Sequence, residues 1–274
     1  MTRIVIMGGG PAGYEAALVA AQYGADVTLV EPDGPGGACV LADCVPSKTF
    51  IASAGGRTAV REAGELGICV PVDAVEVDIA AVHHRVTSLA AAQSTDIRTR
   101  LLLEGVRIIP GRAALADPAP GLSAHRVRAS TPDGASEELA ADFVLIATGA
   151  TPRVLPTAIP DGERILTWRQ VYDLTELPEH LIVVGSGVTG AEFASAYTEM
   201  GVRVTLVSSR DRVLPGEDAE AAAVLEEVFA DRGVTLAKRS RAESVRRVGD
   251  GVEVLLSDGR VITGSHALMT VGSV

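Results

Sequence analysis

Two glycine-rich motifs of the same form constrain the fold of this chain more than any other feature of its sequence. The first runs from Gly8 to Gly13 and the second from Gly185 to Gly190, and both read Gly-x-Gly-x-x-Gly. Each motif follows a short apolar run and precedes an Ala-rich stretch, after which a further apolar run begins. This order predicts a strand, a glycine loop, a helix and a second strand, which together form a dinucleotide-binding unit.

Each of three glycines in the first motif has its own predicted structural role. Gly8 permits a tight turn, Gly10 lets a pyrophosphate approach the backbone, and Gly13 lets the helix pack closely on the strand. The start of the helix offers N–H groups and a positive dipole end to the phosphates. Glu31 follows the next strand, where an acid can hold ribose hydroxyls. The predicted loop is completed by Pro11 and Ala12.

The second motif ends differently from the first. Where the first unit has Glu31, the second has Ser208, so no acid at this point repels a 2′-phosphate. Arg210 and Arg212 follow and are candidates to pair with that phosphate, which favours NADPH over NADH. The alternative is that both arginines are solvated charges of a loop. The loop itself is predicted to comprise Gly185, Gly187, Val188, Thr189 and Gly190.

Apolar runs and turn residues predict the remaining elements. Strands are expected near 3–7, 26–30, 106–109, 126–129, 143–146, 181–184, 203–207, 252–256 and 267–271, and helices near 14–23, 78–103, 168–174, 191–200 and 219–232. With a boundary near residue 152, this pattern predicts an α/β protein of two Rossmann-like domains, 1–152 and 153–274. Each would hold a parallel sheet, an antiparallel meander and helices in three layers. His83 and His84 are expected at the surface, and no metal site is predicted.

Composition excludes several classes of protein. The net charge of −11 argues against a general role in binding nucleic acid or an anionic membrane. No uncharged apolar run approaches the roughly 18 residues that span a bilayer. The N-terminus enters a strand at once and has no secretory signal. We therefore expect a cytoplasmic protein without a transmembrane segment.

Cys39 and Cys44 form a closely spaced thiol pair downstream of the first motif. Three cysteines cannot form a disulfide framework, so a redox use of the pair is the better interpretation. On one helical start, residues this far apart return to nearby faces, and a helix N-terminus acidifies a thiol. The alternative is a pair of buried structural thiols. Cys69 lacks such a setting and is expected to be structural.

The run Gly36-Gly37-Ala38-Cys39-x4-Cys44-Val45-Pro46-Ser47-Lys48, flanked by both motifs, resembles the FAD-dependent pyridine nucleotide–disulfide oxidoreductases. Within that family, the stretches 43–51, 162–169 and 187–193 are similar to an actinobacterial branch of NAD(P)H:quinone dehydrogenases that is often described as dihydrolipoamide dehydrogenase-like. The match runs in order through the whole chain.

The resemblance implies roles for individual residues. The first motif and Glu31 would bind the ADP half of FAD, and the second motif would bind NAD(P)H. Cys44 matches the thiol that lies against the flavin, and Cys39 matches the interchange thiol that attacks a disulfide substrate. Lys48 matches the lysine beside flavin N5, and Glu192 matches the glutamate that pairs with it. The implied cofactor-binding set also contains Gly37, Ala38, Ala113, Ala147, Thr148, Gly149 and Gly272.

The family continues beyond the point where this chain stops. The remaining part would carry a Gly-Asp segment that grips the flavin and a dimerisation domain that supplies an acid–base pair. We therefore expect the chain alone to bind FAD weakly and to reduce disulfides inefficiently.

For the intact protein, the leading hypothesis is a homodimeric FAD enzyme that passes electrons from NAD(P)H to a quinone. One alternative is a dihydrolipoamide dehydrogenase, or another disulfide reductase, that uses Cys39 and Cys44. A second alternative is a non-catalytic nucleotide-binding module.

Overall fold

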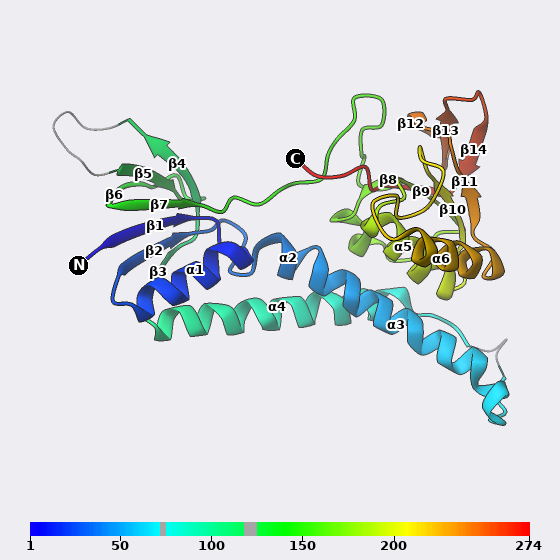
Figure 1. Ribbon diagram of the computed structural model, residues 1–274, viewed down its shortest axis with the longest axis horizontal. Coiled ribbons are helices and arrows are strands. Elements are labelled where there is room, and N and C mark those ends of the chain that lie inside the picture. Colours follow the sequence, from blue (N-terminus) through cyan, green and yellow to red (C-terminus); the bar gives the residue numbers. More distant parts are fainter. Residues whose placement is uncertain (72–74, 118–124) are drawn as a thin grey trace. The chain divides into compact units, whose positions relative to one another are not determined.

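The computed structural model describes residues 1–71, 75–117 and 125–274 and divides into two compact units (Figure 1). One unit contains Met1–Pro46 and Thr87–Ala150, and the other contains Ser47–Val86 and Thr151–Val274. The assignment of one domain to FAD and one to NAD(P)H remains a prediction.

The first unit is built on a parallel sheet with the strand order β3-β2-β1-β7. An antiparallel sheet, β4-β5-β6, covers one face, and helices α1 and α4 cover the other (Figure 1). The bounds are β1 Arg3–Met7, α1 Pro11–Gln22, β2 Asp26–Val30, α2 Gly37–Leu41, α4 Ile79–Leu103, β3 Arg107–Ile109, β4 Arg112–Ala116, β5 His125–Ser130, β6 Ser136–Ala141 and β7 Phe143–Ile146.

Alternation along β1 explains these three layers. Val5 and Met7 pack against the antiparallel sheet, whereas Ile6 between them packs against α1 and α4. Since successive side chains of a strand point to opposite faces, a continuous apolar run fits a strand that is buried on both sides.

The second unit repeats this plan around a parallel sheet with the order β11-β10-β9-β15-β8. Its antiparallel sheet is β12-β13-β14. The bounds are β8 Ile165–Thr167, η3 Gln170–Asp173, β9 His180–Val184, α5 Val188–Glu199, β10 Arg203–Val207, α6 Ala219–Asp231, β11 Thr235–Ala237, β12 Ala242–Val248, β13 Gly251–Leu256, β14 Val261–Gly264 and β15 His266–Met269.

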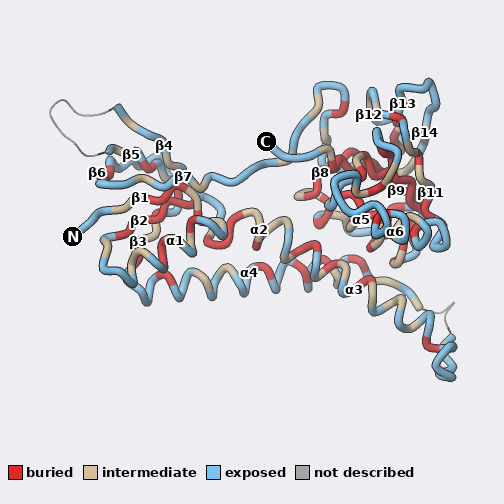
Figure 2. The backbone as a smooth tube through the Cα atoms, in the orientation of Figure 1, coloured by how far each residue is buried: buried red, intermediate tan, exposed pale blue. Residues whose placement is uncertain are grey.

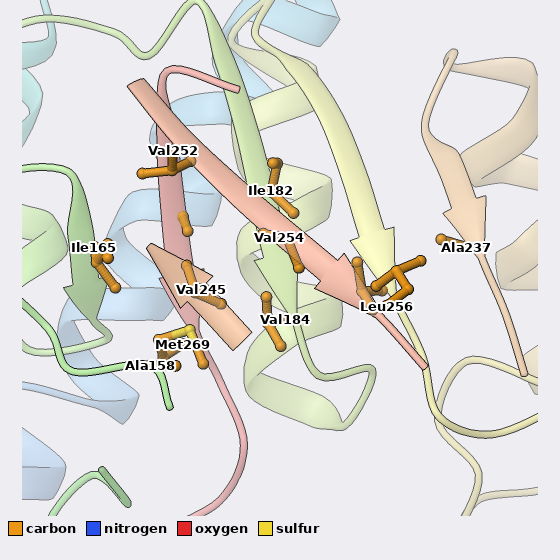
Figure 3. Close-up of a cluster of buried hydrophobic side chains, with 12 residues drawn as sticks. Ala158, Ile165, Ile182, Val184, Ala237, Val245, Val252, Val254, Leu256 and Met269 are labelled. Carbon is orange, nitrogen blue, oxygen red and sulfur yellow. The ribbon is translucent and has the colours of Figure 1, made fainter. Parts of the chain in front are cut away.

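The core of the second unit lies between its two sheets. Strand β9 is buried along its whole length (Figure 2). Figure 3 shows Ile182 and Val184 of β9 among Val245, Val254 and Leu256 from the antiparallel sheet. The predicted α/β class with two Rossmann-like, three-layer units is therefore confirmed.

Two long helices contribute residues to both units. These are α3, Cys44–Glu62, and α4, and a short 3-10 helix, η1 Ala63–Leu66, follows α3. The sequence does not reveal the length of α3, because Pro46 and the pair Gly55-Gly56 are poor helix formers. Pro46 is nevertheless tolerated, since it lies in the first turn. No helix in the described part of the chain is long and apolar enough to cross a membrane.

Most predicted elements are confirmed, and several short strands were missed. The stretch expected to be a helix near 168–174 is the 3-10 helix η3, preceded by strand β8. Strand β6 was missed because it carries two adjacent exposed glutamates, Glu137 and Glu138. Strands rarely contain such charged side chains. Glu137 pairs with Arg107 of β3, and Glu138 pairs with Arg126 and Arg128 of β5. The other missed strands are β4, β11, β12 and β14.

The expectation that His83 lies at the surface is wrong. His83 is 5% exposed, whereas its neighbour His84 is exposed as expected. Adjacent helical residues point in directions about 100° apart, so one of the two faces the interior. Cys69 is also exposed, which contradicts a buried structural role for its thiol. It lies after η1 in a segment without regular structure.

Candidate nucleotide-binding and redox sites

The first glycine motif forms a turn that only glycine can make. Gly8 has a φ of +107° and donates its N–H to the carbonyl of Val30 over 2.9 Å. A Cβ atom on Gly8 would lie 2.2 Å from the Ala147 oxygen, and one on Gly13 would lie 1.8 Å from the Gly8 oxygen. Strand end, loop and helix therefore approach one another more closely than any side chain permits.

The start of α1 is arranged to receive an anion. Gly10 is the N-cap residue and is extended, and no side chain of the described residues caps the helix. The N–H groups of Ala12 and Gly13 therefore face outward from the first turn. A Cβ atom on Gly10 would meet nothing within 4 Å, so the space above this residue is open. Pro11 occupies the first helical turn, where its missing N–H costs nothing.

Glu31 is held against this loop. Its side chain is buried and accepts hydrogen bonds from the N–H of Gly9 over 2.6 Å and from the N–H of Asp33 over 2.8 Å. A Cβ atom on Gly9 would lie 2.8 Å from the Glu31 Cγ. Gly9 is therefore a further site residue that the motif alone did not indicate. A carboxylate oxygen retains a second lone pair for a ribose hydroxyl.

The chain around the thiols packs on the same loop. Gly36 donates its N–H to the Gly9 oxygen over 2.7 Å, and a Cβ atom on Gly37 would lie 2.8 Å from the Gly10 Cα. Helix α2 begins there and contains Ala38 and the half-buried Cys39. The first unit thus brings together the loop, Glu31, Gly37 and Ala147.

The two thiols lie on consecutive helices rather than on one. Helix α2 ends at Leu41, and the Asp43 N–H donates to the Ala38 oxygen over 2.8 Å. The exposed Cys44 is then the first residue of α3. The expectation of a single helical start is therefore wrong, because the chain turns between the two cysteines.

Other predicted residues of the first unit lie at the end of β7 or within the antiparallel sheet. Ala147 donates its N–H to the Met7 oxygen over 2.8 Å, and Gly149 has a φ of +68°. Thr148 between them is exposed. Ala113 lies on β4 opposite Ala129 and packs against the core cluster of the first unit.

The second motif repeats the backbone contacts of the first. Gly185 has a φ of +115° and donates its N–H to the Val207 oxygen over 3.0 Å. A Cβ atom on Gly185 would lie 2.3 Å from the Thr270 oxygen, and one on Gly190 would lie 1.9 Å from the Gly185 oxygen. Gly187 is the extended N-cap of α5, which the side chains of the described residues leave uncapped.

A cavity of about 340 Å³ opens over this second loop. Arg210 and Gly272, two of the residues predicted to bind the nucleotide, line this cavity. Trp168, the only tryptophan of the chain, also lines it and was not predicted. The one sequence feature that could have indicated this site residue is that Trp168 is the single tryptophan of the chain. The lining residues are Trp168, Gly185, Ser186, Gly187, Val188, Thr189, Ser209, Arg210, Pro215, Thr270, Val271, Gly272 and Ser273.

Two of the residues predicted for the 2′-phosphate are engaged elsewhere. Ser208 is buried, its Oγ lies 2.7 Å from the Ser186 Oγ, and it accepts the Arg210 N–H over 3.1 Å. The Arg212 guanidinium donates to the carbonyls of Pro215 and Glu217 over 3.3 and 3.4 Å. Ser208 therefore shapes the loop, and Arg212 is tied to its own turn.

Lys48 and Glu192 form an ion pair in the second unit. The Lys48 Nζ lies 2.6 Å from the Glu192 Oε1, and their side chains are 58% and 19% exposed. Beneath this pair, Phe50 packs against Phe193 and Tyr197 with ring centroids 6.1 and 5.0 Å away. Apolar contacts between α3 and α5 thus fix the positions of both charges.

His83 extends this aromatic cluster. Its ring lies 5.7 Å from the Phe50 ring and 5.8 Å from the Tyr172 ring, and its Nδ1 lies 2.8 Å from the Leu174 oxygen. Burial lowers the pKa of His83, although the hydrogen bond to the Leu174 carbonyl opposes the shift. His83 is therefore a neutral ring of the core near neutral pH.

The chain is 62% identical over an alignment of 277 residues to NAD(P)H dehydrogenase (quinone) of Mycobacterium tuberculosis. It is 34% identical over 273 residues to dihydrolipoyl dehydrogenase of Chlorobaculum tepidum. These alignments include 100% and 98% of the chain, which spans 56% of the length of each relative.

Solved structures agree with this relationship. The crystal structure of LpdA from Mycobacterium tuberculosis superposes with a TM-score of 0.94 at 61% identity, covering 100% of this chain and 59% of that one. The HOCl-induced flavoprotein disulfide reductase RclA from Escherichia coli gives a TM-score of 0.81 at 23% identity, covering 100% and 57%, and supports the fold alone. The family model described as pyridine nucleotide-disulphide oxidoreductase matches residues 2–274. The chain therefore belongs to the pyridine nucleotide-disulphide oxidoreductase family.

Proposed function

We propose that the whole protein oxidises NAD(P)H and passes the electrons through FAD to a quinone. The observation that carries this proposal is the pair of equivalent dinucleotide cradles in one chain, each with an uncapped helix start and a glycine turn. Similarity to the mycobacterial quinone dehydrogenase supports a quinone as the acceptor. A homodimer and a cytoplasmic location belong to the same proposal.

The first cradle fits the ADP half of FAD. Open space above Gly10 and the outward N–H groups of α1 suit a pyrophosphate, and the fixed carboxylate of Glu31 suits ribose hydroxyls. Bound FAD would supply a group that accepts a hydride and releases electrons singly or in pairs. Gly37, Ala38 and the turn from Ala147 to Gly149 would line the same cradle. Ala113 of β4 is the remaining member of this proposed cofactor-binding set.

The second cradle fits NAD(P)H. The N–H groups at the start of α5 would hold its pyrophosphate, and Arg210 at the rim would meet the adenosine end. The loop residues Val188 and Thr189 and the glycine at 272 would line the remaining wall. Trp168, which is buried and lines the cavity, would form part of the apolar wall of the site.

Lys48 would act as a cation near the reacting groups. It follows Cys44 by one turn of α3, and Glu192 holds its ammonium in place. A fixed positive charge stabilises an anionic product better than mobile water does. Glu192 would therefore position Lys48.

A disulfide reductase is the second candidate, and one observation favours it. Both cysteines are present, with Cys39 half-buried beside the first loop and Cys44 exposed at the start of α3. Cys39 would attack a disulfide substrate, forming a mixed disulfide and releasing one substrate thiol. Cys44 would then attack the Cys39 sulfur, releasing the second substrate thiol and forming the Cys39–Cys44 disulfide. Two electrons from NAD(P)H, passed on by the flavin, would reduce this internal disulfide again. The name of the dihydrolipoyl dehydrogenase relatives indicates a dihydrolipoyl group as their substrate.

The two candidates separate in one experiment. The full-length protein, loaded with FAD, is assayed with NADPH or NADH against a menadione-type quinone and against lipoamide. If the quinone is the acceptor, Cys39→Ser retains most quinone reduction, and Cys69→Ser serves as a control for loss of an exposed thiol. Failure to reduce any quinone would sink the leading proposal. Lipoamide turnover that disappears in Cys39→Ser would establish the second candidate instead.

A further inference from the structure

The loops that follow β10 and β11 are joined through their backbones. The Arg239 N–H donates to the Arg210 oxygen over 2.9 Å. On either side of this contact, the Ser208 N–H donates to the Ala237 oxygen over 2.9 Å, and the Ser240 N–H donates to the Ser208 oxygen over 3.0 Å. Arg210 and Arg239 therefore occupy adjacent positions at the carboxyl edge of the parallel sheet, where ligands of such sheets bind.

We infer that Arg239, together with Arg210, forms the subsite that selects the 2′-phosphate of NADPH. The inference rests on the proposed NAD(P)H site and adds a residue to it. The carboxyl ends of β10 and β11 flank the point where an acid would otherwise hold the ribose, and Ser208 replaces that acid. A phosphate there would meet guanidinium groups from two loops instead of a carboxylate.

The charges around this edge favour Arg239 over its neighbours. Lys238 is paired with Glu226 over 2.6 Å, and the Arg212 guanidinium is bound to carbonyls of its own turn. Arg210 and Arg239 are exposed, and no salt bridge within the described part of the chain includes either. Both guanidinium groups are therefore available to an anionic ligand.

The backbone at Arg239 is strained in a way that fits a binding role. Its φ of +58° lies in the left-handed region, which is costly for a residue with a long side chain. Such strain persists where surrounding contacts enforce it, and it concentrates at ligand sites. Here the contact to Arg210 and the buried Ser240 on the next position supply that enforcement.

Binding measurements on the chain of 274 residues test the inference directly. Trp168 lines the cavity and is the only tryptophan, so quenching of its fluorescence reports nucleotide binding without any enzyme activity. The unaltered chain should bind NADPH more tightly than NADH. Arg239→Ala should weaken NADPH binding about 10- to 100-fold, the usual effect of losing a charged hydrogen bond, and should change NADH binding less than about twofold.

Two further variants make the result specific. Arg239→Asn tolerates the left-handed backbone and should behave as Arg239→Ala does, which separates charge from strain. Arg203→Ala removes the same charge from the opposite end of β10 and should leave the ratio of NADPH to NADH affinity unchanged. Higher salt should weaken NADPH binding by the unaltered chain. In both Arg239 variants, the same increase in salt should weaken NADPH binding less.

The outcomes distinguish this inference from the proposed function. If both nucleotides bind and Arg239→Ala leaves their affinity ratio unchanged, the subsite is overturned and the nucleotide site stands. The same holds if Arg212→Ala alone abolishes the preference for NADPH. If neither nucleotide quenches the Trp168 fluorescence of the unaltered chain, the nucleotide site and the subsite are overturned together.

Discussion

The hydroxyl oxygens of Ser186 and Ser208 lie 2.7 Å apart, at the position where the first unit holds the Glu31 carboxylate on the Gly9 N–H. The two motifs share three glycines and differ at this contact, where Ser186 and Ser208 replace Gly9 and Glu31. A carboxylate repels a 2′-phosphate, whereas two hydroxyls do not. The contact therefore offers a direct way to change which nucleotide the second unit binds.

Replacing both serines should convert the second unit to a preference for NADH. Ser186→Gly with Ser208→Glu reproduces the residues of the first unit, so the new carboxylate can accept the backbone N–H and ribose hydroxyls. We expect the ratio of NADPH to NADH affinity to fall at least about tenfold, as measured by Trp168 fluorescence.

Ser208→Glu alone is the matched comparison for this double variant. A side chain at position 186 leaves little room for the glutamate, because a Cβ atom on Gly9 would lie only 2.8 Å from the Glu31 Cγ. The single variant should therefore lose stability that the double variant keeps. A double variant that still prefers NADPH would contradict the equivalence of the two units.

Two glycines of the second loop should respond differently to alanine. Gly187→Ala places its Cβ in open space, so the unfolding free energy should change little while NADPH binding falls. Gly190→Ala places its Cβ 1.9 Å from the Gly185 oxygen, so the turn and helix α5 must separate. We expect the second change to cost more than about 2 kcal/mol.

Thermal or urea unfolding followed by circular dichroism checks both expectations. The contrast within one loop is the informative result, because both substitutions add the same methyl group. Equal stability of the two variants would show that the close approach at Gly190 does not constrain the chain.

Sequence reasoning recovered the elements whose signal is local. The glycine turns, both strands beside each turn and the acid at Glu31 follow from spacing and residue type. Contacts between distant segments were not available from those patterns. The hydrogen bond from Gly9 to Glu31 and the joining of Arg210 to Arg239 depend on which strands are neighbours.

Other residues were misplaced because their patterns are ambiguous. His83 and His84 look alike in sequence, and only the packing of α4 decides which one is buried. The break between α2 and α3 carries no proline or glycine at its turn, so a single helix was a reasonable but wrong expectation. Exposed strands such as β6 have too few apolar residues to be recognised.

His266 should make the second unit less stable in acid. Burial, and secondarily the charge of Arg164, lowers the pKa of His266 to about 4. The unfolded chain takes up this proton near the usual histidine pKa of ~6.5, whereas the folded chain does not until about pH 4. Stability should therefore fall as the pH falls across this interval, by on the order of 1 to 2 kcal/mol after allowing for solvent screening.

Urea unfolding at a series of pH values measures this loss. His266→Gln should flatten the dependence on pH, because a glutamine takes up no proton. His84→Gln removes an exposed histidine and should leave the dependence as it is. An unchanged profile in His266→Gln would assign the acid sensitivity to other groups.

Lys48→Met should affect electron transfer far more than stability. The Lys48 side chain is 58% exposed, and exposed ion pairs contribute about 0 to 1 kcal/mol to the unfolding free energy. If its ammonium stabilises an anionic product, its loss should make the reduction potential of FAD in the full-length protein more negative. Oxidation of NADPH should slow at least about tenfold.

The chain provides a matched control for this last change in its only other lysine. Lys238 pairs with Glu226 over 2.6 Å, the same distance that separates Lys48 from Glu192. Lys238→Met therefore removes an equivalent ion pair away from α3 and should leave the FAD potential unchanged. Glu192→Gln should change the potential less than Lys48→Met does, because loss of the carboxylate charge raises the potential while release of the Lys48 ammonium lowers it. Potentials that are equal in all four proteins would show that the Lys48–Glu192 pair only fastens α3 to α5.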